Sequence, residues 1–541
     1  MDPLDPARSG VTADLAAEIR EGRTTLGIEL GSTRIKAVLI GSDHRPLAVG
    51  TAEWENQFVD RVWTYSMDAV WAGLQQCYAA LAADVRRTYA VQLASVGGLG
   101  ISAMMHGYLA LDADGELLTP FRTWRNTNTG RAAEALSAAF GANVPHRWSV
   151  AHLYQSVLDD EPHLPAIAHL TTLAGYVHWQ LSGERSLGVG DASGMFPIDT
   201  TTGGYDAAML DEFDRLAADS ALAAKLADLL PPVLVAGQAA GALSAKGALL
   251  LDPTGVLAPG AVMCPPEGDA GTGMVATNSV APRTGNVSAG TSIFAMAVLE
   301  GPLDRAHREI DLVTTPAGDP VAMVHCNNGA SELNAWAGLF AQFARAAGTP
   351  LETGAVFEVL LRSARDAAPD GDGLMAFNYL SGEPITGLEE GRPLFFRTPG
   401  SALDLGTFVR TQLYAVLATL RLGMDVLQRE EGMQLERLFA HGGLFKTAGV
   451  AQALLAGALD TPVAVGDVAA EGGAWGIAVL AAFSQQGGHP DGLAAFLDTE
   501  VFADAVLSTV DPQPEDVRGF TAFMERYVQA LPVVRAAVRH S

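Results

Sequence analysis

Cysteine is scarce in this chain, with only three among 541 residues, at Cys77, Cys264 and Cys326. They are widely spaced and form no CxxC pair, so the sequence offers neither a disulfide framework nor a zinc site. The sequence also lacks a basic N-terminal region followed by an apolar run, and any uninterrupted apolar stretch of about 18 residues. From these absences we expect a cytoplasmic protein with no signal peptide and no membrane span.

Basic residues are also few, because 34 Lys and Arg stand against 61 Asp and Glu, giving a net charge of -27. Such a charge repels phosphate backbones, which excludes nucleic acid as an expected partner. An anionic substrate would therefore need a local site built from backbone N–H groups and a metal. A hydrophobic content of 49% is typical of a globular protein with large buried sheets.

The first strong pattern is a β-rich run over residues 24–30, a small-residue turn at Gly31-Ser32-Thr33, and a second β-rich run over 35–40. This pattern predicts a hairpin. Apolar residues at helical spacing predict a helix over 65–89, and a strand is expected over 91–101. The alternation of strands and helices indicates an α/β fold.

The hairpin pattern returns over residues 285–298, around the turn Ala289-Gly290-Thr291-Ser292. A long amphipathic helix is expected over 407–430, and a strand over 438–440 leads into His441-Gly442-Gly443. Two similar halves predict a duplicated architecture with a cleft between them. We expect a leader or short helix over 1–22, a first domain over 23–282 and a second over 283–541, with the boundary at Pro282-Arg283.

The first hairpin carries residue types that suit a phosphate site. A tight turn lets backbone N–H groups, Ser32 and Thr33 approach phosphate oxygens closely. Glu29 could hold a hydrated magnesium ion, and Lys36 could reach the transferred phosphate. Taken alone, a hairpin of this kind is structural in most proteins, and it matches neither a P-loop nor a GxGxxG fingerprint.

A second signal is Asp269, which lies in the glycine-rich tract over residues 265–273. Phosphoryl transfer needs a carboxylate that orients and deprotonates the attacking hydroxyl group. The competing interpretation is that Asp269 caps the helix that follows it. Both roles are compatible, because a carboxylate at a helix start can also face a ligand.

The motifs occur in a fixed order: a glycine hairpin, an Asp among glycines, a second hairpin, then Gly-Gly. This order resembles the FGGY family of carbohydrate kinases, relatives of hexokinase and actin. The resemblance extends from about residue 24 to about residue 483. The resemblance implies two ribonuclease H-like domains of the actin/hexokinase type, an interdomain cleft, and the use of ATP with Mg2+. It implies that Asp269 is the catalytic base and that Glu29 holds the metal through water. It also implies ATP-binding positions at Gly31, Ser32, Thr33, Lys36, Gly290, Thr291, Gly442, Gly443 and Thr447.

On the sugar side, Met105-His106-Gly107 is similar to the Met-His-Gly of xylulokinases, and Trp124 and Asn126 lie where the family approaches its substrate. The resemblance implies phosphorylation of a terminal hydroxyl group of a small sugar, with the ketopentoses L-ribulose and D-xylulose favoured. Glycerol, erythritol and gluconate remain alternatives. Alternatives of another class are a sugar-independent ATPase and a sugar-binding regulator. A homodimer also stays open.

Four features depart from the family pattern. Glu29 replaces the usual Asp, and Ser32-Thr33 replaces the usual pair of threonines in the phosphate loop. Met104 replaces a common Gln, and Leu444 replaces a small residue after Gly-Gly. These departures indicate a divergent branch. Other candidates receive structural interpretations: Trp54, Trp63 and Trp71 are expected to be packing residues, and the segment 191–194 is expected to be mainly structural.

Overall fold

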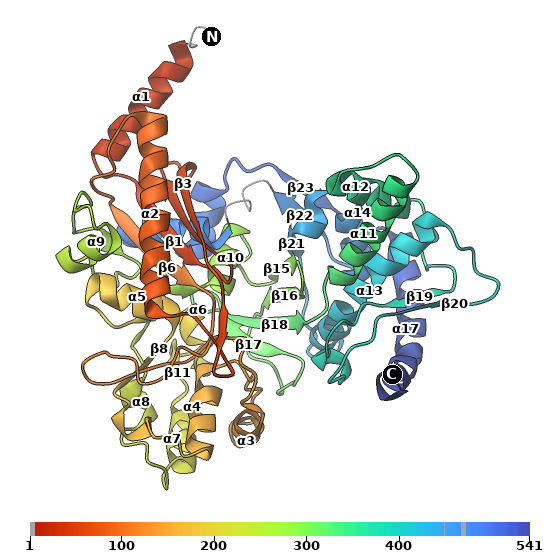
Figure 1. Cartoon of the computed structure of the whole chain (residues 1–541), viewed down its shortest axis with the longest axis horizontal. Helices are drawn as coiled ribbons and strands as arrows, with labels where there is room; N and C mark the ends of the chain where they lie inside the picture. Colours follow the sequence, from red (N-terminus) through yellow and green to blue (C-terminus); the bar gives the residue numbers. More distant parts are fainter. Residues whose placement is uncertain (1–5, 448, 467–471, 541) are drawn as a thin grey trace. The chain divides into compact units, whose positions relative to one another are not determined.

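The chain is described by a computed structural model that covers residues 6–447, 449–466 and 472–540. It divides into two compact units (Figure 1). The first unit comprises Met1–Val280, Leu312–Pro320 and Val468–Asp504, and the second comprises Ala281–Asp311, Val321–Asp467 and Ala505–Ser541. The chain first crosses between them two residues before the expected boundary at Pro282-Arg283. The segment Val468–Asp504, placed by sequence in the second domain, packs with the first unit.

The first unit is built on a mixed sheet in the order β13-β6-β1-β2-β3, with β14 pairing with the far part of β6. Strands β1, β2 and β3 are antiparallel, whereas β13, β6, β14 and β1 run parallel. The bounds are β1 Thr25–Leu30, β2 Arg34–Ile40, β3 Pro46–Glu53, β6 Gly98–Ala103, β13 Val262–Met263 and β14 Glu267–Gly268. The predicted hairpin is therefore confirmed.

Helices cover this sheet, which explains why its strands read as continuous apolar runs. Helix α2 (Met67–Tyr89) packs on β3, and α15 (Gly472–Gln485) packs on β1 and β6. A Cβ atom on Gly27 would lie 2.1 Å from the carbonyl oxygen of Ala474, so only glycine allows β1 and α15 to approach this closely. Helix α2 confirms the prediction over 65–89, and Ser66 caps it by accepting the Ala69 N–H at 3.2 Å.

The strand expected over 91–101 is only partly correct, because β6 begins at Gly98 and residues 91–97 form no strand. The apolar side chains Val91, Leu93 and Val96 that suggested a strand are buried, but they lie in a loop that leads into the sheet. Other elements of the first unit lie outside this sheet. They include β4 (Gln57–Val59) and β5 (Val62–Thr64), which precede β6, and α3 (Gly130–Phe140), α4 (Ser149–Leu158), α5 (Leu173–Ser182) and α10 (Asp269–Ala276), which follow it.

The second unit carries its own mixed sheet, in which β18, β16, β15, β21, β22 and β23 are neighbours in that order. The bounds are β15 Thr284–Ala289, β16 Ile293–Val298, β18 Pro320–Cys326, β21 Arg437–Gly442, β22 Val463–Gly466 and β23 Leu507–Val510. The hairpin β15–β16 and the strand that leads to Gly442 were both predicted. The α/β fold with two actin-like sheets is thus confirmed.

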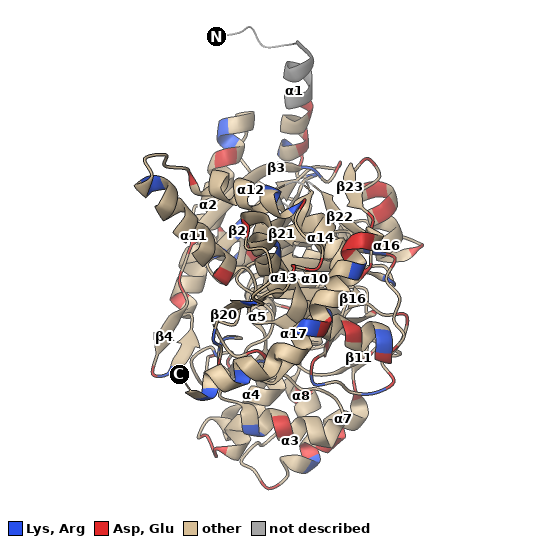
Figure 2. Ribbon diagram, turned by 90° about the vertical axis from the view of Figure 1, so that its right-hand side faces the viewer, with Lys and Arg blue, Asp and Glu red and all other residues tan. Residues whose placement is uncertain are grey.

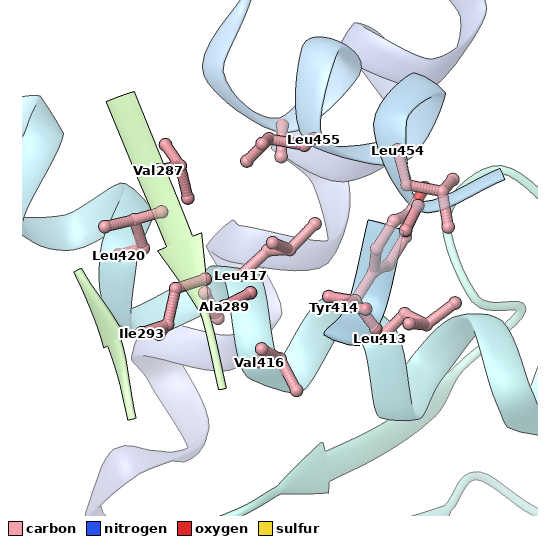
Figure 3. Packing of buried hydrophobic residues seen from close by; sticks show 14 of the residues in the cluster. Val287, Ala289, Ile293, Leu413, Tyr414, Val416, Leu417, Leu420, Leu454 and Leu455 are labelled. Atoms are coloured by element: carbon pink, nitrogen blue, oxygen red, sulfur yellow. The ribbon is translucent and has the colours of Figure 1, made fainter. Parts of the chain in front are cut away.

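The core of the second unit lies between this sheet and the long helix α13 (Leu405–Asp425). Figure 3 shows Leu417 and Leu420 of α13 directed toward Ala289 and Ile293 of the hairpin. The long helix expected over 407–430 is therefore confirmed, although most of α13 is buried rather than one face alone. Helices α14 (Val450–Leu459) and α17 (Pro514–His540) pack against it. Val426–Glu430 continue α13 as a π-helical turn.

None of the helices in the described part of the chain is long and apolar enough to cross a membrane. Among the described residues seen in Figure 2, Lys and Arg are scattered between Asp and Glu on separate elements rather than gathered on one surface. This distribution agrees with the acidic composition of the chain.

Candidate active site

Three loops of the first unit meet at the carboxyl ends of parallel strands, where α/β sheets commonly bind ligands. Leu30 at the end of β1 is in register with Ala103 at the end of β6, and Ala103 is also in register with Gly268 of β14. The next residues along the chain are Gly31, Met104 and Asp269. The fold therefore gathers the first hairpin turn, the Met-His-Gly segment and the candidate base at one edge.

Asp269 is the first residue of α10, and Gly268 occupies the N-cap position. Its carboxylate does not serve as an N-cap; instead Oδ1 accepts the backbone N–H of Met105 at 3.1 Å. Desolvation raises the pKa of this half-buried carboxyl group above its usual value, while hydrogen bonds from Met105 and Ala270 lower it. The carboxylate is thus joined to the segment expected to contact the sugar.

Glu29, in β1, has its carboxylate near Asp269 and next to the first turn of α15. Its Oε2 accepts the backbone N–H of Ala474 at 3.2 Å, where the helix dipole favours a negative charge. Burial, followed by the charge of Asp269, raises the pKa of Glu29 to about 7, although Lys36 and the Ala474 N–H lower it. Two neighbouring carboxylates suit Mg2+, because the ion prefers oxygen ligands and relieves their repulsion.

A site with several direct protein ligands is not present among the described residues, which contain no group of three His, Cys, Asp or Glu arranged to hold a metal. Mg2+ commonly keeps most of its waters and uses one or two carboxylates together with substrate phosphates. The arrangement of Glu29 and Asp269 therefore fits a hydrated ion. Lys36 is in register with Glu29 across the hairpin, so a cationic side chain accompanies this carboxylate.

A pocket of 710 Å3 opens beside the first hairpin turn. Trp124 reaches this turn by donating its Nε1–H to Ser32 Oγ at 3.3 Å, and its side chain is 37% exposed. Arg125 stacks on Trp63 with 3.9 Å between the guanidinium carbon and the ring centre. The pocket is lined by Ser32, Thr33, Arg34, Glu53, Trp54, Glu55, Asn56, Trp124 and Arg125. An exposed indole next to polar groups is a surface on which a sugar can stack.

The Met105-His106-Gly107 segment has an unusual backbone, because His106 has a φ of +71° and Gly107 a φ of +97°. The His106 ring is buried, and its Nδ1 lies 3.1 Å from the carbonyl oxygen of Gly194. Since a carbonyl oxygen only accepts, Nδ1 carries a proton and donates this hydrogen bond.

Asn126 makes three hydrogen bonds to the backbone of neighbouring segments. Its Oδ1 accepts the Trp63 N–H at 2.9 Å, and its Nδ2 donates to the carbonyl groups of Trp63 and Thr123 at 2.8 and 3.0 Å. These bonds hold the Trp63 strand beside the pocket and use both amide hydrogens. The amide oxygen has a second lone pair, so its contact with a sugar stays a prediction.

Sequence reasoning missed Glu267, two residues before Asp269. This fully buried carboxyl group accepts the backbone N–H of Asp191 at 2.9 Å and that of Gly190 at 3.4 Å. Thr172 donates its hydroxyl to Asp191 at 2.6 Å. Glu267 therefore anchors the segment that ends at Gly194, the partner of His106. A charged residue in an apolar, glycine-rich tract was the signal that could have identified it.

The predicted nucleotide residues of the second unit lie at the ends of neighbouring parallel strands. Ala289 of β15 is in register with Gly442 of β21, so Gly290 and Gly443 follow at the same sheet edge. Gly290 and Thr291 are exposed in the hairpin turn, and Thr447 is half-buried after the short helix that begins at Gly443. The family resemblance extends to the segment 471–474 at the entry to α15, of which Glu471 lies outside the described residues.

Comparison with known proteins gives two family matches. The N-terminal domain of the FGGY family of carbohydrate kinases matches residues 24–256, and its C-terminal domain matches residues 285–485. No curated protein matches the chain by sequence.

Solved structures share the whole architecture. A xyloylose kinase from Brucella ovis is 21% identical, with a TM-score of 0.76 over 95% of this chain and 100% of that chain. A xylulose kinase from Rhodospirillum rubrum is 20% identical, with the same TM-score over 95% and 100%. A gluconate kinase from Lactobacillus acidophilus is 15% identical, with a TM-score of 0.75 over 96% and 99%.

At these identities the solved structures establish a common fold, and their named substrates differ. The two domain matches follow one another in family order and together account for most of residues 24–485. The protein belongs to the FGGY family of carbohydrate kinases, enzymes that transfer a phosphoryl group to an alcohol group.

Proposed function

We propose that this kinase uses ATP and Mg2+ to phosphorylate a terminal hydroxyl group of a small open-chain sugar, most plausibly a ketopentose. The observation that carries the proposal is the hydrogen bond from the Met105 N–H to Asp269. It joins a carboxylate suited to proton transfer to the Met-His-Gly segment, which resembles that of xylulokinases. Phosphoryl transfer requires mainly that the attacking hydroxyl group is positioned and that charge around the phosphates is stabilised.

In the proposed reaction, Asp269 orients the hydroxyl group and accepts its proton while the oxygen attacks the γ-phosphorus of ATP. The bond from the γ-phosphorus to its bridging oxygen breaks, and ADP leaves. Glu29 would hold a hydrated magnesium ion, which would supply charge neutralisation for the phosphates. Lys36 and the backbone N–H groups of the first turn stabilise the transferring group. Gly31, Ser32 and Thr33 are the proposed contacts there.

In the second unit, the proposed nucleotide contacts are Gly290 and Thr291 of the hairpin turn, with Gly442, Gly443 and Thr447 near the adenosine. Small residues suit these positions because a nucleotide must approach the backbone closely. Buried Leu444 follows the glycine pair and would give the adenine pocket a bulkier wall than the usual small residue does.

For the sugar, the proposed contacts are His106 as a hydrogen-bonding side chain, Met105 and Gly107 as the backbone of the site, and Trp124 as a stacking surface. L-Ribulose and D-xylulose are the leading candidates. Glycerol, erythritol and gluconate remain alternatives, and a gluconate kinase of the same fold shows that this architecture serves more than one substrate class. Reaction in the cytoplasm and a homodimer are further expectations.

The test is ADP release with Mg-ATP, measured against a panel of ketopentoses, polyols and aldonates. Saturable, sugar-dependent release with L-ribulose or D-xylulose alone supports the proposal and identifies the substrate. Release with a polyol or aldonate alone supports kinase activity but assigns a different class of substrate. Sugar-independent release points to an ATPase. Sugar binding without any release points to a regulator.

A further inference from the structure

Two carbonyl groups of the first hairpin turn are held by aromatic side chains from other segments. Trp54, just after β3, donates its Nε1–H to the Gly31 carbonyl at 2.7 Å. Tyr65, just after β5, donates its hydroxyl to the Ser32 carbonyl at 2.6 Å. Within the turn, the Gly31 N–H donates to the Arg34 carbonyl at 3.0 Å. The Gly31–Ser32 and Ser32–Thr33 peptides are therefore both fixed from outside the hairpin.

These two hydrogen bonds also fix the directions of the Ser32 and Thr33 N–H groups, because each of them shares a peptide with one of the bonded carbonyl groups. All peptide bonds of the described residues are trans, and in a trans peptide the C=O and N–H groups point to opposite sides. Since the Gly31 carbonyl points to Trp54, the Ser32 N–H points away from it. In the same way, the Thr33 N–H points away from Tyr65. The aromatic pair thus sets where both N–H groups are aimed.

The second hairpin turn has the same feature with unrelated donors. There the Gly290 carbonyl accepts the Ala330 N–H, and the Thr291 carbonyl accepts the Gly329 N–H, both at 2.8 Å. A Cβ atom at position 329 would lie 2.6 Å from the Gly290 carbonyl oxygen, so glycine is needed for this approach. The corresponding two carbonyl groups are held in both turns, once by side chains and once by backbone. Local packing alone gives no reason for this agreement.

The two aromatic rings form a rigid support. They stack with 4.1 Å between their centres and 25° between their planes, and both side chains are buried. Burial raises the pKa of Tyr65 to about 12, so its hydroxyl group remains a donor across the working range of the enzyme. The expectation that Trp54 is a packing residue is therefore incomplete, because its ring packs while its N–H holds the turn.

We propose that Trp54 and Tyr65 are positioning residues that aim the Ser32 and Thr33 N–H groups of the first turn at the phosphate oxygens of the nucleotide. This inference rests on the proposed function, which assigns phosphate binding to that turn. Removing either donor leaves a carbonyl group without its partner and lets one peptide rotate. The other contacts of the fold remain, so the expected loss is in affinity for the phosphates of the nucleotide.

The variants Tyr65→Phe and Trp54→Phe remove one donor each and retain an aromatic ring. Tyr89→Phe is the matched control, because the Tyr89 hydroxyl also donates to a backbone carbonyl, that of Leu47 at 3.0 Å, away from the turn. Calorimetry gives the affinities of each variant for Mg-ADP, adenosine and the sugar, and urea unfolding gives its stability. We expect Mg-ADP binding to weaken roughly tenfold in Tyr65→Phe and Trp54→Phe, the size expected when one buried carbonyl loses its donor.

Adenosine affinity should stay at the wild-type value in both variants. Sugar affinity should stay there in Tyr65→Phe, which is the decisive variant because Trp54 itself lines the pocket beside the turn. All three affinities should stay at the wild-type value in Tyr89→Phe. A merely structural role would instead weaken adenosine and sugar binding together with Mg-ADP, and would overturn the proposal. So would unchanged Mg-ADP binding in folded Tyr65→Phe and Trp54→Phe.

Lys36→Met separates this inference from the proposed function. If Lys36→Met weakens Mg-ADP binding while the aromatic variants do not, the phosphate site stands and the positioning role fails. If neither Lys36→Met nor the aromatic variants alter Mg-ADP binding, the first turn does not bind phosphates, and both proposals fail together.

Discussion

The backbone N–H of Met105 donates to Oδ1 of Asp269 at 3.1 Å. This bond ties the segment after β6 to the first residue of α10, so the proposed base and the proposed sugar segment share one geometry. A substitution at either position is expected to affect the orientation of the other. Substitutions that remove charge but keep the side-chain shape are therefore the most informative.

Asp269→Asn is expected to lower kcat roughly 1000-fold, within the range of general-base contributions, because the amide cannot accept the hydroxyl proton. Its Oδ1 can still accept the Met105 N–H, so the loop should remain in place. ADP-release kinetics with the identified sugar measure the loss, and calorimetry should give unchanged affinity for Mg-ATP. Asp199→Asn, in an exposed turn of the same unit, is the control. Turnover retained in Asp269→Asn would refute the base assignment.

Glu29→Gln is expected to raise the Mg2+ concentration needed for half-maximal activity about tenfold, because the uncharged amide attracts the hydrated ion less strongly. The substitution keeps an acceptor for the Ala474 N–H, so α15 should stay anchored. A titration of MgCl2 at fixed ATP measures the change. Glu29→Asp, which restores the usual family residue, should need no more Mg2+ than the wild type. An identical Mg2+ requirement in Glu29→Gln would remove this residue from the metal site.

Gly442→Ala is expected to destabilise the second unit by about 3 kcal/mol, because backbone strain and a steric clash both oppose the new methyl group. Gly442 has a φ of +107° and a ψ of 177°, and a Cβ atom there would lie 2.3 Å from the Ala289 carbonyl oxygen. Urea unfolding measures the loss. Equal stability in Gly442→Ala and the wild type would contradict the geometry of this strand end.

Gly443→Ala serves as the matched comparison for stability, because a Cβ atom at this position meets no heavy atom within 4 Å. Its free energy of unfolding should stay within about 0.5 kcal/mol of the wild type. Because Gly443 is a proposed adenosine contact, the KM for ATP should nevertheless rise. The pair therefore separates a backbone requirement from a nucleotide contact.

Glu383 is expected to make stability depend on pH. The carboxyl group is fully buried and accepts the Asn328 N–H at 3.3 Å and the Asn328 Nδ2–H at 3.0 Å, yet burial raises its pKa from 4.5 to about 7. The folded state then binds the proton more tightly than the unfolded state does. The contribution of Glu383 to stability is fully present below pH 4.5 and is lost as the pH rises through about 7, by roughly 3 kcal/mol in total.

Urea unfolding of the wild type and Glu383→Gln between pH 4.5 and 8 tests this sign. The wild type should lose stability relative to Glu383→Gln across that interval, and a constant difference would contradict the prediction. The charge of Glu383 also raises the pKa values of Cys326, Tyr379 and Tyr527, but these groups titrate above the interval. Glu358→Gln, at an exposed ion pair with Arg362, controls for a change in net charge.

Both hairpins, the helix over 67–89 and the place of Asp269 could be predicted from sequence, because each depends on a short local pattern. The turns Gly31-Ser32-Thr33 and Gly290-Thr291-Ser292 join apolar runs that can form no other compact structure. The order of these patterns then identified the family. Local patterns do not reveal which distant groups satisfy a polar side chain, so the bonds of Asn126 to the backbone of Trp63 could not be predicted.

The same limit explains the other misses. Trp54 reads as packing in sequence, since nothing local shows that its N–H reaches the Gly31 carbonyl. Glu267 lies two residues before Asp269, which was predicted as the base. Its partners Gly190 and Asp191 lie more than 70 residues earlier, so the sequence around Glu267 does not reveal them. The burial of α13 depends on helices and strands from other parts of the chain.

The place of α15 affects how the protein can fold during synthesis. The ribosome makes β1 and β6 within the first 103 residues, but the helix that packs on them ends at Gln485. Until that helix emerges, the nascent chain exposes an apolar sheet face, and Gly27 lacks its packing contact with the backbone of Ala474. Domains that are contiguous in sequence can fold in order as they are made. In this protein the first unit is completed only after most of the second has been translated, so the early chain must remain soluble with an unfinished core.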